Sequence, residues 1–401
     1  MAIVNNNSAK LSILLMAGAQ AMLNSTTSIL ISSASLVALL LLDVDKSLAT
    51  VPVTAVVTGT ALATIPASMF MKRAGRKPGF IFGILLGMLG ASIAGYSIYM
   101  GSFIGFTLGA MMIGTCTAFG NYYRFAAIDV AGPQNRSKAV SYVMAGGLVA
   151  GFIGPQIASH TKDLFPPFTY LGPYLAIILL GVIALVFISF VKIPKIKETT
   201  FDEDARPLKE IIKQPTFLLA MLSAMVGYAG MSFVMTATPL AMIGCGLTAT
   251  DSFNVISWHV VAMFGPSFFT GSLISRYGDF KVIFAGAILG VLSVIVALSG
   301  LSISNFWIAL VLLGLSWNFM FIGGTTLLTT TYRTSEASKV QGFNDFMVFG
   351  TVATASLSAG ILQQKFGWDV VNMSVLPFFI LVAVVAVVKI LNGTRVIAPA
   401  E

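Results

Sequence analysis

Apolar stretches long enough to cross a membrane follow one another along nearly the whole chain. A bilayer core of roughly 30 Å is crossed by about 20 helical residues. Twelve such stretches lie near residues 11–37, 47–71, 79–99, 102–127, 137–159, 170–192, 215–240, 252–274, 281–301, 305–331, 337–362 and 369–392. Only 9% of the residues are charged, against about 25% in an ordinary soluble chain. The sequence therefore predicts an all-α integral membrane protein with twelve transmembrane helices, and it excludes a soluble enzyme and a disordered chain.

Positive charges are divided unevenly between the two sides that twelve helices would define. If both termini are cytosolic, only Lys46, Lys162 and Lys365 of the 23 Lys and Arg residues fall on the outer side. Because cytosolic loops of membrane proteins are enriched in Lys and Arg, this division predicts that both termini are cytosolic. We expect a multi-pass protein of the plasma membrane, in this case a bacterial inner membrane.

One polar stretch interrupts the apolar pattern near the middle of the chain. Residues 195–214 belong to the only dense mixture of positive and negative side chains in the sequence. We expect a cytosolic linker here, between an N-terminal six-helix bundle at 1–194 and a C-terminal six-helix bundle at 215–401. Pro207 to Ile212 could open a short interfacial helix. A binding site for a regulator is the alternative to a plain hinge.

The second cytosolic turn of each predicted bundle carries similar residues. Arg73 and Gly75 recur as Arg276 and Gly278, 203 residues further along the chain. A short turn between helices needs a residue that adopts positive φ easily, which Gly does. Two six-helix halves with matching turns predict a transporter built from parallel repeats.

With these turns, the sequence resembles the major facilitator superfamily. That family's turn between helices 2 and 3 reads approximately Gly-x-Leu-Ala-Asp-Arg-x-Gly-Arg-Lys. The residues that match it, here and in the second-half copy, are Arg73, Gly75, Arg76, Lys77, Gly271, Arg276 and Gly278. Lys72 stands at the acidic position, which puts in doubt the family's ion pair that locks the two halves together, and Ala110 stands near the place of a common helix 4 Arg. The resemblance covers essentially the whole chain and implies two pseudo-symmetric six-helix bundles around a central cavity.

In that family, helices 1, 4, 7 and 10 line the central cavity. The corresponding stretches here carry polar and aromatic residues at helical spacing, as with Gln20, Asn24 and Thr27 at i, i+4 and i+7. Because polar groups are costly in hydrocarbon, such residues line a wet cavity or bond to neighbouring helices, and both interpretations stay open. The candidate solute-binding residues are Gln20, Asn24, Thr27, Asn121, Tyr122, Arg124, Tyr228, Ser232, Trp317 and Asn318.

Ionisable side chains inside the predicted helices are rare. Asp345 lies in the eleventh stretch, roughly 10 Å along a helix that rises 1.5 Å per residue, where a carboxylate must pair, protonate or face water. With Asn344 it is a candidate polar gate or proton site, and a structural bond is the alternative. His259 could titrate in a proton relay or be a core histidine held by a hydrogen bond. Arg124 could contact a solute or pair with Asp129.

The candidate cavity residues are mostly neutral and include several aromatic rings. They favour a secondary active transporter that moves a small neutral or weakly charged, ring-bearing organic solute by alternating access, coupled to protons as a symporter or antiporter. Vitamin-like compounds, aromatic metabolites and amphipathic drugs fit this description, and the direction of transport stays open. The alternatives are a multidrug or metabolite exporter of the same fold and a membrane sensor or scaffold that transports nothing.

Signatures of catalysis are missing from the sequence. It contains no phosphate-binding loop, and its two His and two Cys do not form a metal-binding pattern. Cys116 and Cys245 lie far apart in apolar runs, so we expect free thiols. We therefore expect no enzyme activity, no cofactor, no metal and no nucleic-acid partner. The expected partners are a small-molecule solute, protons and the lipid bilayer, and we expect a monomer.

Overall fold

A computed structural model gives the fold and describes residues 6–42, 48, 51–193 and 205–392. All regular secondary structure in these residues is helical. Within them, ten helices are long and apolar enough to cross a membrane. The predictions for both chain ends, Lys46 and linker residues 195–204 lie outside the described residues.

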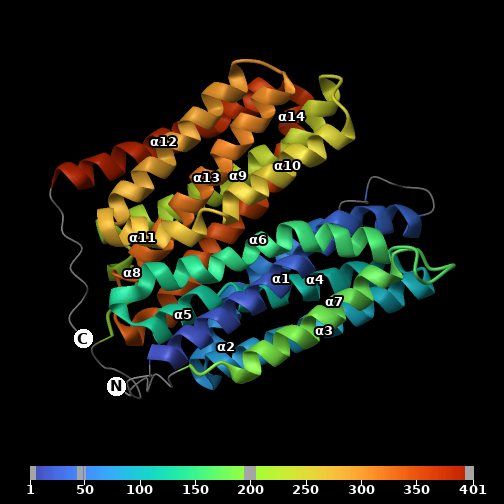
Figure 1. Cartoon of the computed structure of the whole chain (residues 1–401), viewed down its shortest axis with the longest axis horizontal. Helices are drawn as coiled ribbons and strands as arrows, with labels where there is room; N and C mark the ends of the chain where they lie inside the picture. The colour runs from blue at the N-terminus through green and yellow to red at the C-terminus, as the bar shows by residue number, and fades with distance from the viewer. Residues whose placement is uncertain (1–5, 43–47, 49–50, 194–204, 393–401) are drawn as a thin grey trace. The chain divides into compact units, whose positions relative to one another are not determined.

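The chain divides into two compact units, and the first comprises residues 1–134 and 146–195. Its helices are α1 (Asn6–Leu41), α2 (Val51–Ala74), α3 (Arg76–Met100), α4 (Phe103–Gly120), α5 (Tyr123–Ala131), most of α6 (Arg136–Thr161) and α7 (Leu171–Phe190). Figure 1 shows α3 and α7 running alongside each other. Phe106, Tyr174 and Ile177 are buried in the core, where α4 and α7 pack with α1.

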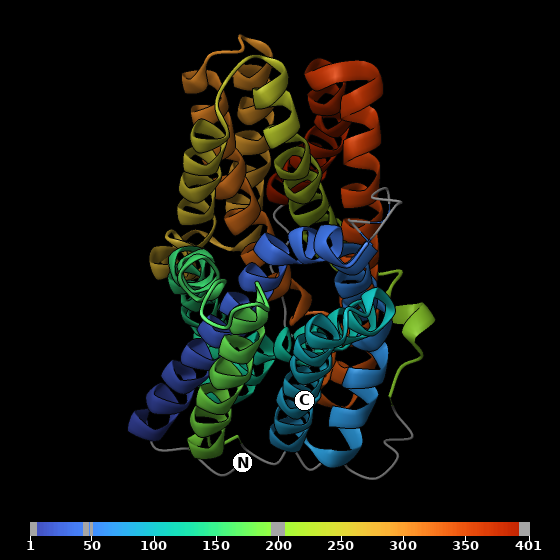
Figure 2. The same ribbon diagram turned by 90° about the vertical axis from the view of Figure 1, so that its right-hand side faces the viewer.

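The second unit comprises residues 135–145 and 196–401, so that the first ten residues of α6 belong to it. Its other helices are α8 (Leu208–Ile211), α9 (Pro215–Gly244), α10 (Ala249–Phe264), α11 (Ser267–Tyr277), α12 (Asp279–Leu298), α13 (Ile303–Leu328) and α14 (Ala337–Leu391). Figure 2 shows these helices in colours from yellow-green to red. α8 confirms the short helix predicted within Pro207–Ile212.

α14 contains two helices joined across a kink. Gly367 has a φ of 79° and a ψ of −177°, which is not helical. This backbone region is essentially restricted to Gly. The predicted stretches 337–362 and 369–392 lie on either side of Gly367.

Two of the predicted stretches are each broken into two helices. The break between α4 and α5 lies at Asn121–Tyr122, and the break between α10 and α11 lies at Gly265–Pro266. Pro266 explains the second break, because proline lacks the N–H of a continuing helix and clashes with the preceding turn. The predicted positions of the apolar stretches thus agree with the helices, while the count of twelve and the two six-helix bundles stay predictions.

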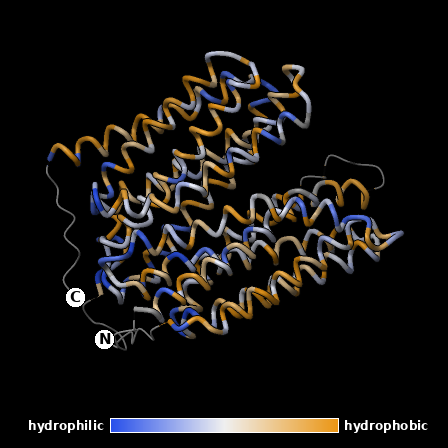
Figure 3. Tube along the Cα trace, in the orientation of Figure 1, coloured by the Kyte–Doolittle hydropathy of each residue, from blue (hydrophilic) through white to orange (hydrophobic). Residues whose placement is uncertain are grey.

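Apolar residues predominate along most helices of both units, as the orange tube in Figure 3 shows. The two cysteines are free thiols, as predicted: Cys116 is buried and Cys245 is exposed. Large apolar side chains such as Leu85, Leu179 and Phe190 are exposed on the outer faces of the helices. This pattern is typical of helices whose outer face meets lipid rather than water.

Candidate functional site

The polar residues predicted on α1 bond mainly along that helix. Gln20 Nε2 donates to Asn24 Oδ1 at 2.8 Å, and Thr27 Oγ1 donates to the carbonyl of Leu23 at 3.2 Å. Gln20 is buried, while Asn24 and Thr27 are half-buried. The amide groups of Gln20 and Asn24 are therefore bonded to each other along α1.

The break between α4 and α5 holds three further predicted residues. Tyr122 is fully buried, and its hydroxyl donates to the carbonyl of Thr64 on α2 at 3.1 Å. Asn121 Nδ2 is buried and has no hydrogen-bond acceptor among the described residues. Arg124 is buried with its guanidinium carbon 4.8 Å from the centre of the Phe125 ring. Asn121, Tyr122 and Arg124 thus place three polar side chains at the break between α4 and α5.

An aromatic cluster in the second unit brings together two of the predicted residues, Tyr228 of α9 and Trp317 of α13. Their ring centres lie 5.4 Å apart in an edge-to-face arrangement. Phe321 and Phe349 lie 5.1 and 5.5 Å from Tyr228, and Phe264 lies 5.2 Å from Trp317. We call these five rings the aromatic cluster.

The indole N–H of Trp317, in the aromatic cluster, is a buried polar group without an acceptor among the described residues. Trp317 is 1% exposed, and its Nε1 has no hydrogen-bond acceptor among the described residues. A buried donor without an acceptor costs about 1–3 kcal/mol. Tyr228 and Phe264 are only half-buried, so the edge of the cluster can contact a solute. The Nε1–H itself is buried, so an acceptor on a solute reaches it only if neighbouring side chains move.

Three members of the aromatic cluster, Phe264, Phe321 and Phe349, were not among the predicted residues. With 30 Phe in the chain, an individual Phe carries little information. The one available signal was the spacing of Trp317 and Phe321 at i and i+4, which places both rings on one face of a helix.

Ser232 and Asn318 are occupied within the second unit. The hydroxyls of Ser232 and Ser356 lie 2.6 Å apart. Asn318 Nδ2 donates to the Met263 carbonyl at 2.6 Å and to Ser267 Oγ at 2.7 Å, beside the break between α10 and α11. A proline break frees backbone carbonyls, which neighbouring polar side chains must satisfy inside a membrane. Asn318 thus holds this break, and its role toward a solute stays a prediction.

The candidate gate residues lie in separate places. Asn344 Nδ2 donates to Asp345 Oδ1 at 2.9 Å, and both residues are buried in α14. His259 is buried in α10, and its Nδ1 lies 2.7 Å from the carbonyl of Leu310 on α13. Among the described residues, no group of three or more His, Cys, Asp or Glu could hold a metal ion.

A cavity of about 400 Å³ lies between α9 and the two helices of α14. None of the predicted site residues lines it. Its wall is mainly apolar, with Phe233 and Phe378 among the lining residues. Thr351 and Thr354 donate their hydroxyl protons to carbonyls of their own helix, so these hydroxyls can only accept. The cavity suits an apolar group better than a polyhydroxylated one.

The predicted turn of the first unit is organised by two cations. Gly75 has a φ of 96° and ends α2. Arg76 Nε lies 2.6 Å from Asp129 Oδ2 at the end of α5, and Lys77 Nζ donates to the Ser189 carbonyl at 2.5 Å. Arg73 is exposed. The turn therefore ties the starts and ends of several helices of the first unit together.

The matching turn of the second unit has a different arrangement. Gly278 has a φ of 89°, and Asp279 beside it pairs with Arg136 at 3.3 Å. Gly271 packs against the start of α6, where a Cβ would lie 2.6 Å from the Ser137 carbonyl. The guanidinium carbon of Arg276 lies 5.3 Å from the neighbouring Tyr277 ring.

Known proteins resemble this chain along nearly its whole length. Residues 11–350 match the family model of the Major Facilitator Superfamily. The riboflavin transporter RfnT of Brucella anthropi is 40% identical over 384 residues, which cover 95% of this chain and 96% of that protein.

Solved structures show the same fold at low sequence identity. The transporter FucP in its outward conformation has a TM-score of 0.73 at 18% identity, covering 96% of this chain and 98% of that one. The human organic anion transporter MFSD10 has a TM-score of 0.73 at 12% identity, covering 95% and 100%. These structures support the fold alone. On the family match and the 40% identity, this chain belongs to the major facilitator superfamily of multi-pass membrane transporters, which are not enzymes.

Proposed function

We propose that this protein is a secondary active transporter for a neutral, flat, ring-bearing solute of the riboflavin class. The aromatic cluster is the observation that carries this proposal, because it combines stacked and edge-on rings with the unsatisfied Nε1–H of Trp317. Riboflavin has a flat three-ring system that can stack on aromatic side chains, and carbonyl oxygens in the plane of its rings can accept a hydrogen bond from this N–H. The riboflavin transporter that is 40% identical gives independent support.

In this proposal, the protein has twelve helices in two six-helix bundles and moves its solute by alternating access. The protein acts as a monomer in a bacterial inner membrane with both termini in the cytosol. The direction of transport depends on how solute movement is coupled to protons, and the Asp345 variant described below tests that coupling.

Binding tests the proposal directly, because riboflavin fluoresces and aromatic stacking quenches its emission. Purified protein is expected to quench riboflavin fluorescence saturably, and riboflavin is expected to raise the temperature of thermal unfolding. Trp317→Phe keeps a ring but removes the N–H, and should weaken binding by about tenfold if one buried hydrogen bond of roughly 1.5 kcal/mol is lost. Trp258→Phe is the matched control, because Trp258 is exposed and contacts Trp307 outside the aromatic cluster. Absence of quenching by wild-type protein would reject the riboflavin class.

Asp345 is the proposed proton site. Its carboxyl group is buried in α14 next to Asn344, and a carboxylate at such a position is costly enough in a membrane to mark a functional group. Asp345→Asn should keep riboflavin binding but abolish accumulation driven by a pH gradient in proteoliposomes. Unchanged accumulation would reject Asp345 as the coupling residue. Binding without transport in the wild-type protein would instead favour a sensor.

A further inference from the structure

A fully buried carboxylate lies in the turn between α13 and α14. The Glu336 side chain is 0% exposed, although it belongs to the short 3-10 turn Thr334–Glu336 that connects the two helices. An ionised carboxylate is expensive to bury unless it is paired and hydrogen-bonded. The groups that donate hydrogen bonds to Glu336 therefore indicate which segments this turn holds in place.

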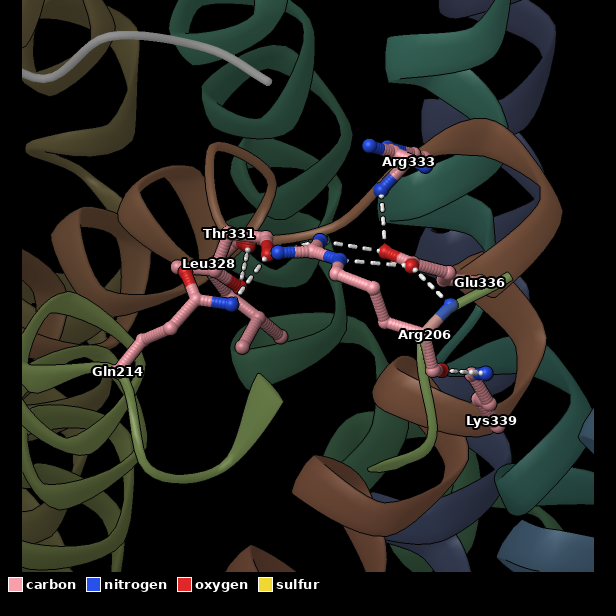
Figure 4. A network of polar contacts seen from close by, with 7 residues as sticks. All are labelled: Arg206, Gln214, Leu328, Thr331, Arg333, Glu336 and Lys339. Atoms are coloured by element: carbon pink, nitrogen blue, oxygen red, sulfur yellow. Dashed lines mark hydrogen bonds and ion pairs between the residues drawn. The ribbon is translucent and has the colours of Figure 1, made fainter. Parts of the chain in front are cut away.

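The main partner is Arg206, which precedes Glu336 by 130 residues and comes from the predicted linker. Its backbone N and its Nε each donate to Glu336 Oε1 at 2.9 Å, and its Nη2 donates to Oε2 at 2.6 Å. The backbone N of Arg333 also donates to Oε2, at 2.8 Å. Figure 4 shows that the guanidinium and the backbone of Arg206 together contact both carboxylate oxygens of Glu336. Such charge-assisted, two-pronged contacts are the strongest side-chain hydrogen bonds in proteins.

The ion pair also fits the ends of the two helices that it bridges. Arg206 Nη2 donates at 3.1 Å to the carbonyl of Thr331, just beyond the C-terminal end of α13, where a helix favours a cation. Glu336 immediately precedes the N-terminal end of α14, where a helix favours an anion. Each charge therefore lies at the helix end that stabilises it.

Two further contacts extend the attachment along the linker. Lys339 of α14 donates through Nζ to the carbonyl of Arg206. Gln214, immediately before α9, donates through Nε2 to the carbonyl of Thr331 at 3.1 Å. Residues 206–214 are thus fastened at both ends to the α13–α14 turn, and we call this segment the strap.

We propose that Arg206 is a positioning residue of the transport cycle, which acts by fastening the strap to Glu336. The fastened strap makes the adjoining ends of α9, α13 and α14 move together as one body. Its loss lowers the rate of conformational exchange and leaves the affinity for the solute unchanged, because no strap residue belongs to the aromatic cluster. This inference rests on the transport function proposed above.

The experiment compares Arg206→Gln, Glu336→Gln and the double variant in full-length protein. Arg206→Gln leaves Glu336 charged and buried, so it should lower the unfolding temperature most. The double variant removes the buried charge as well, so its unfolding temperature should recover toward that of wild type. Lys209→Gln is the matched control, because Lys209 is an exposed cation of α8 in the same segment.

Transport kinetics distinguish an effect of Arg206 on the rate of the transport cycle from an effect on protein stability alone. In proteoliposomes, the double variant should transport with a maximal rate about threefold to tenfold below wild type, the range of a coupled conformational contribution, and with an unchanged KM. Arg206→Lys keeps one ion pair and should give an intermediate rate. Lys209→Gln should match wild type. A double variant that transports at the wild-type maximal rate would overturn the inference.

Limited proteolysis tests the strap independently of transport. Trypsin should cleave after Lys209 faster in the double variant than in wild type, because release exposes the segment. Equal cleavage rates would show that residues 206–214 are not fastened in solution and would reject the strap. If the wild-type protein transports no flavin at all, the proposed function fails, while this proteolysis result still decides whether the strap exists.

Discussion

The turns that follow α2 and α11 have the same backbone geometry but opposite charge. Gly75 has φ 96° and ψ 159°, and Gly278 has φ 89° and ψ 158°. The next residue is Arg76 in the first turn and Asp279 in the second, and each of them begins a helix. Arg76 pairs with Asp129, whereas Asp279 pairs with Arg136. The repeat therefore preserves the shape of the turn while the polarity of its ion pair is inverted.

The inversion changes which charge is buried. Arg76 and Asp129 have similar side-chain exposures of 14% and 15%. In the second pair, Arg136 is 21% exposed but Asp279 only 6%. A buried charge that loses its partner is far costlier than a half-solvated one. Substituting the glycine of either turn should therefore reduce the free energy of unfolding equally. Removing the cation of the ion pair should reduce it more in the second turn than in the first.

The largest expected effect comes from removing each cation. Arg136→Gln leaves Asp279 buried and unpaired and should reduce the free energy of unfolding by about 3–5 kcal/mol. Arg76→Gln leaves a partly solvated Asp129 and should cost about 1–2 kcal/mol. Chemical unfolding in mixed micelles measures both. Adding Asp279→Asn to Arg136→Gln should restore most of the loss, and equal losses for the two single variants would contradict the comparison.

The next effect comes from the glycines. Gly75→Ala and Gly278→Ala should each cost about 1–3 kcal/mol, because both place a side chain in a backbone region that essentially only glycine adopts. Gly101→Ala is the control, since its φ of 67° and ψ of 26° lie in the milder left-handed helical region. Chemical unfolding in the same micelles should give equal losses in the free energy of unfolding at positions 75 and 278 and a smaller loss at 101. Clearly unequal losses at 75 and 278 would show that the two turns are not equivalent.

A smaller effect on the free energy of unfolding is expected at Tyr122, a predicted site residue of the first unit. The hydroxyl of Tyr122 holds the backbone of α2 at Thr64, so Tyr122→Phe should lower the free energy of unfolding by about 1 kcal/mol and leave riboflavin affinity unchanged. Fluorescence titration and thermal unfolding on the same sample test this. A weakened affinity without a stability loss would move Tyr122 into the solute site.

The smallest effect concerns two matching helix caps. Ser102 before α4 accepts a hydrogen bond from the backbone N of Gly105, and Ser302 before α13 accepts one from Asn305. Ser102→Ala and Ser302→Ala should each cost about 0.5–1 kcal/mol, as for other helix caps. Thermal unfolding should show two similar small decreases. A large difference between them would mean that one cap has a role beyond its own helix.

The sequence predicted the helices well because membrane burial leaves a strong local signal. The stretches near 79–99 and 170–192 became α3 and α7 within a few residues at each end, since apolar length alone determines where a helix can cross a bilayer. The breaks at Asn121 and Pro266 were not predicted. Both lie inside apolar runs, where the average hydropathy hides a local change of backbone.

The candidate site was predictable only in part, because its contacts join residues far apart in the chain. Tyr228 and Trp317 were predicted as solute-binding residues, and the structure places them in one aromatic cluster. Arg206 was counted as part of the linker, because no local pattern reveals a partner 130 residues away. Asp129 was considered as a partner of Arg124, and the structure pairs it with Arg76.

Uptake of radiolabelled riboflavin by proteoliposomes tests the central claim most directly. Vesicles with wild-type protein should take up the label faster than empty vesicles, excess unlabelled riboflavin should compete, and Trp317→Ala should reduce uptake to the empty-vesicle level. Trp258→Phe should transport like wild type. Wild-type vesicles that take up no more label than empty ones, or full uptake by Trp317→Ala, would contradict a ring-bearing solute held by the aromatic cluster.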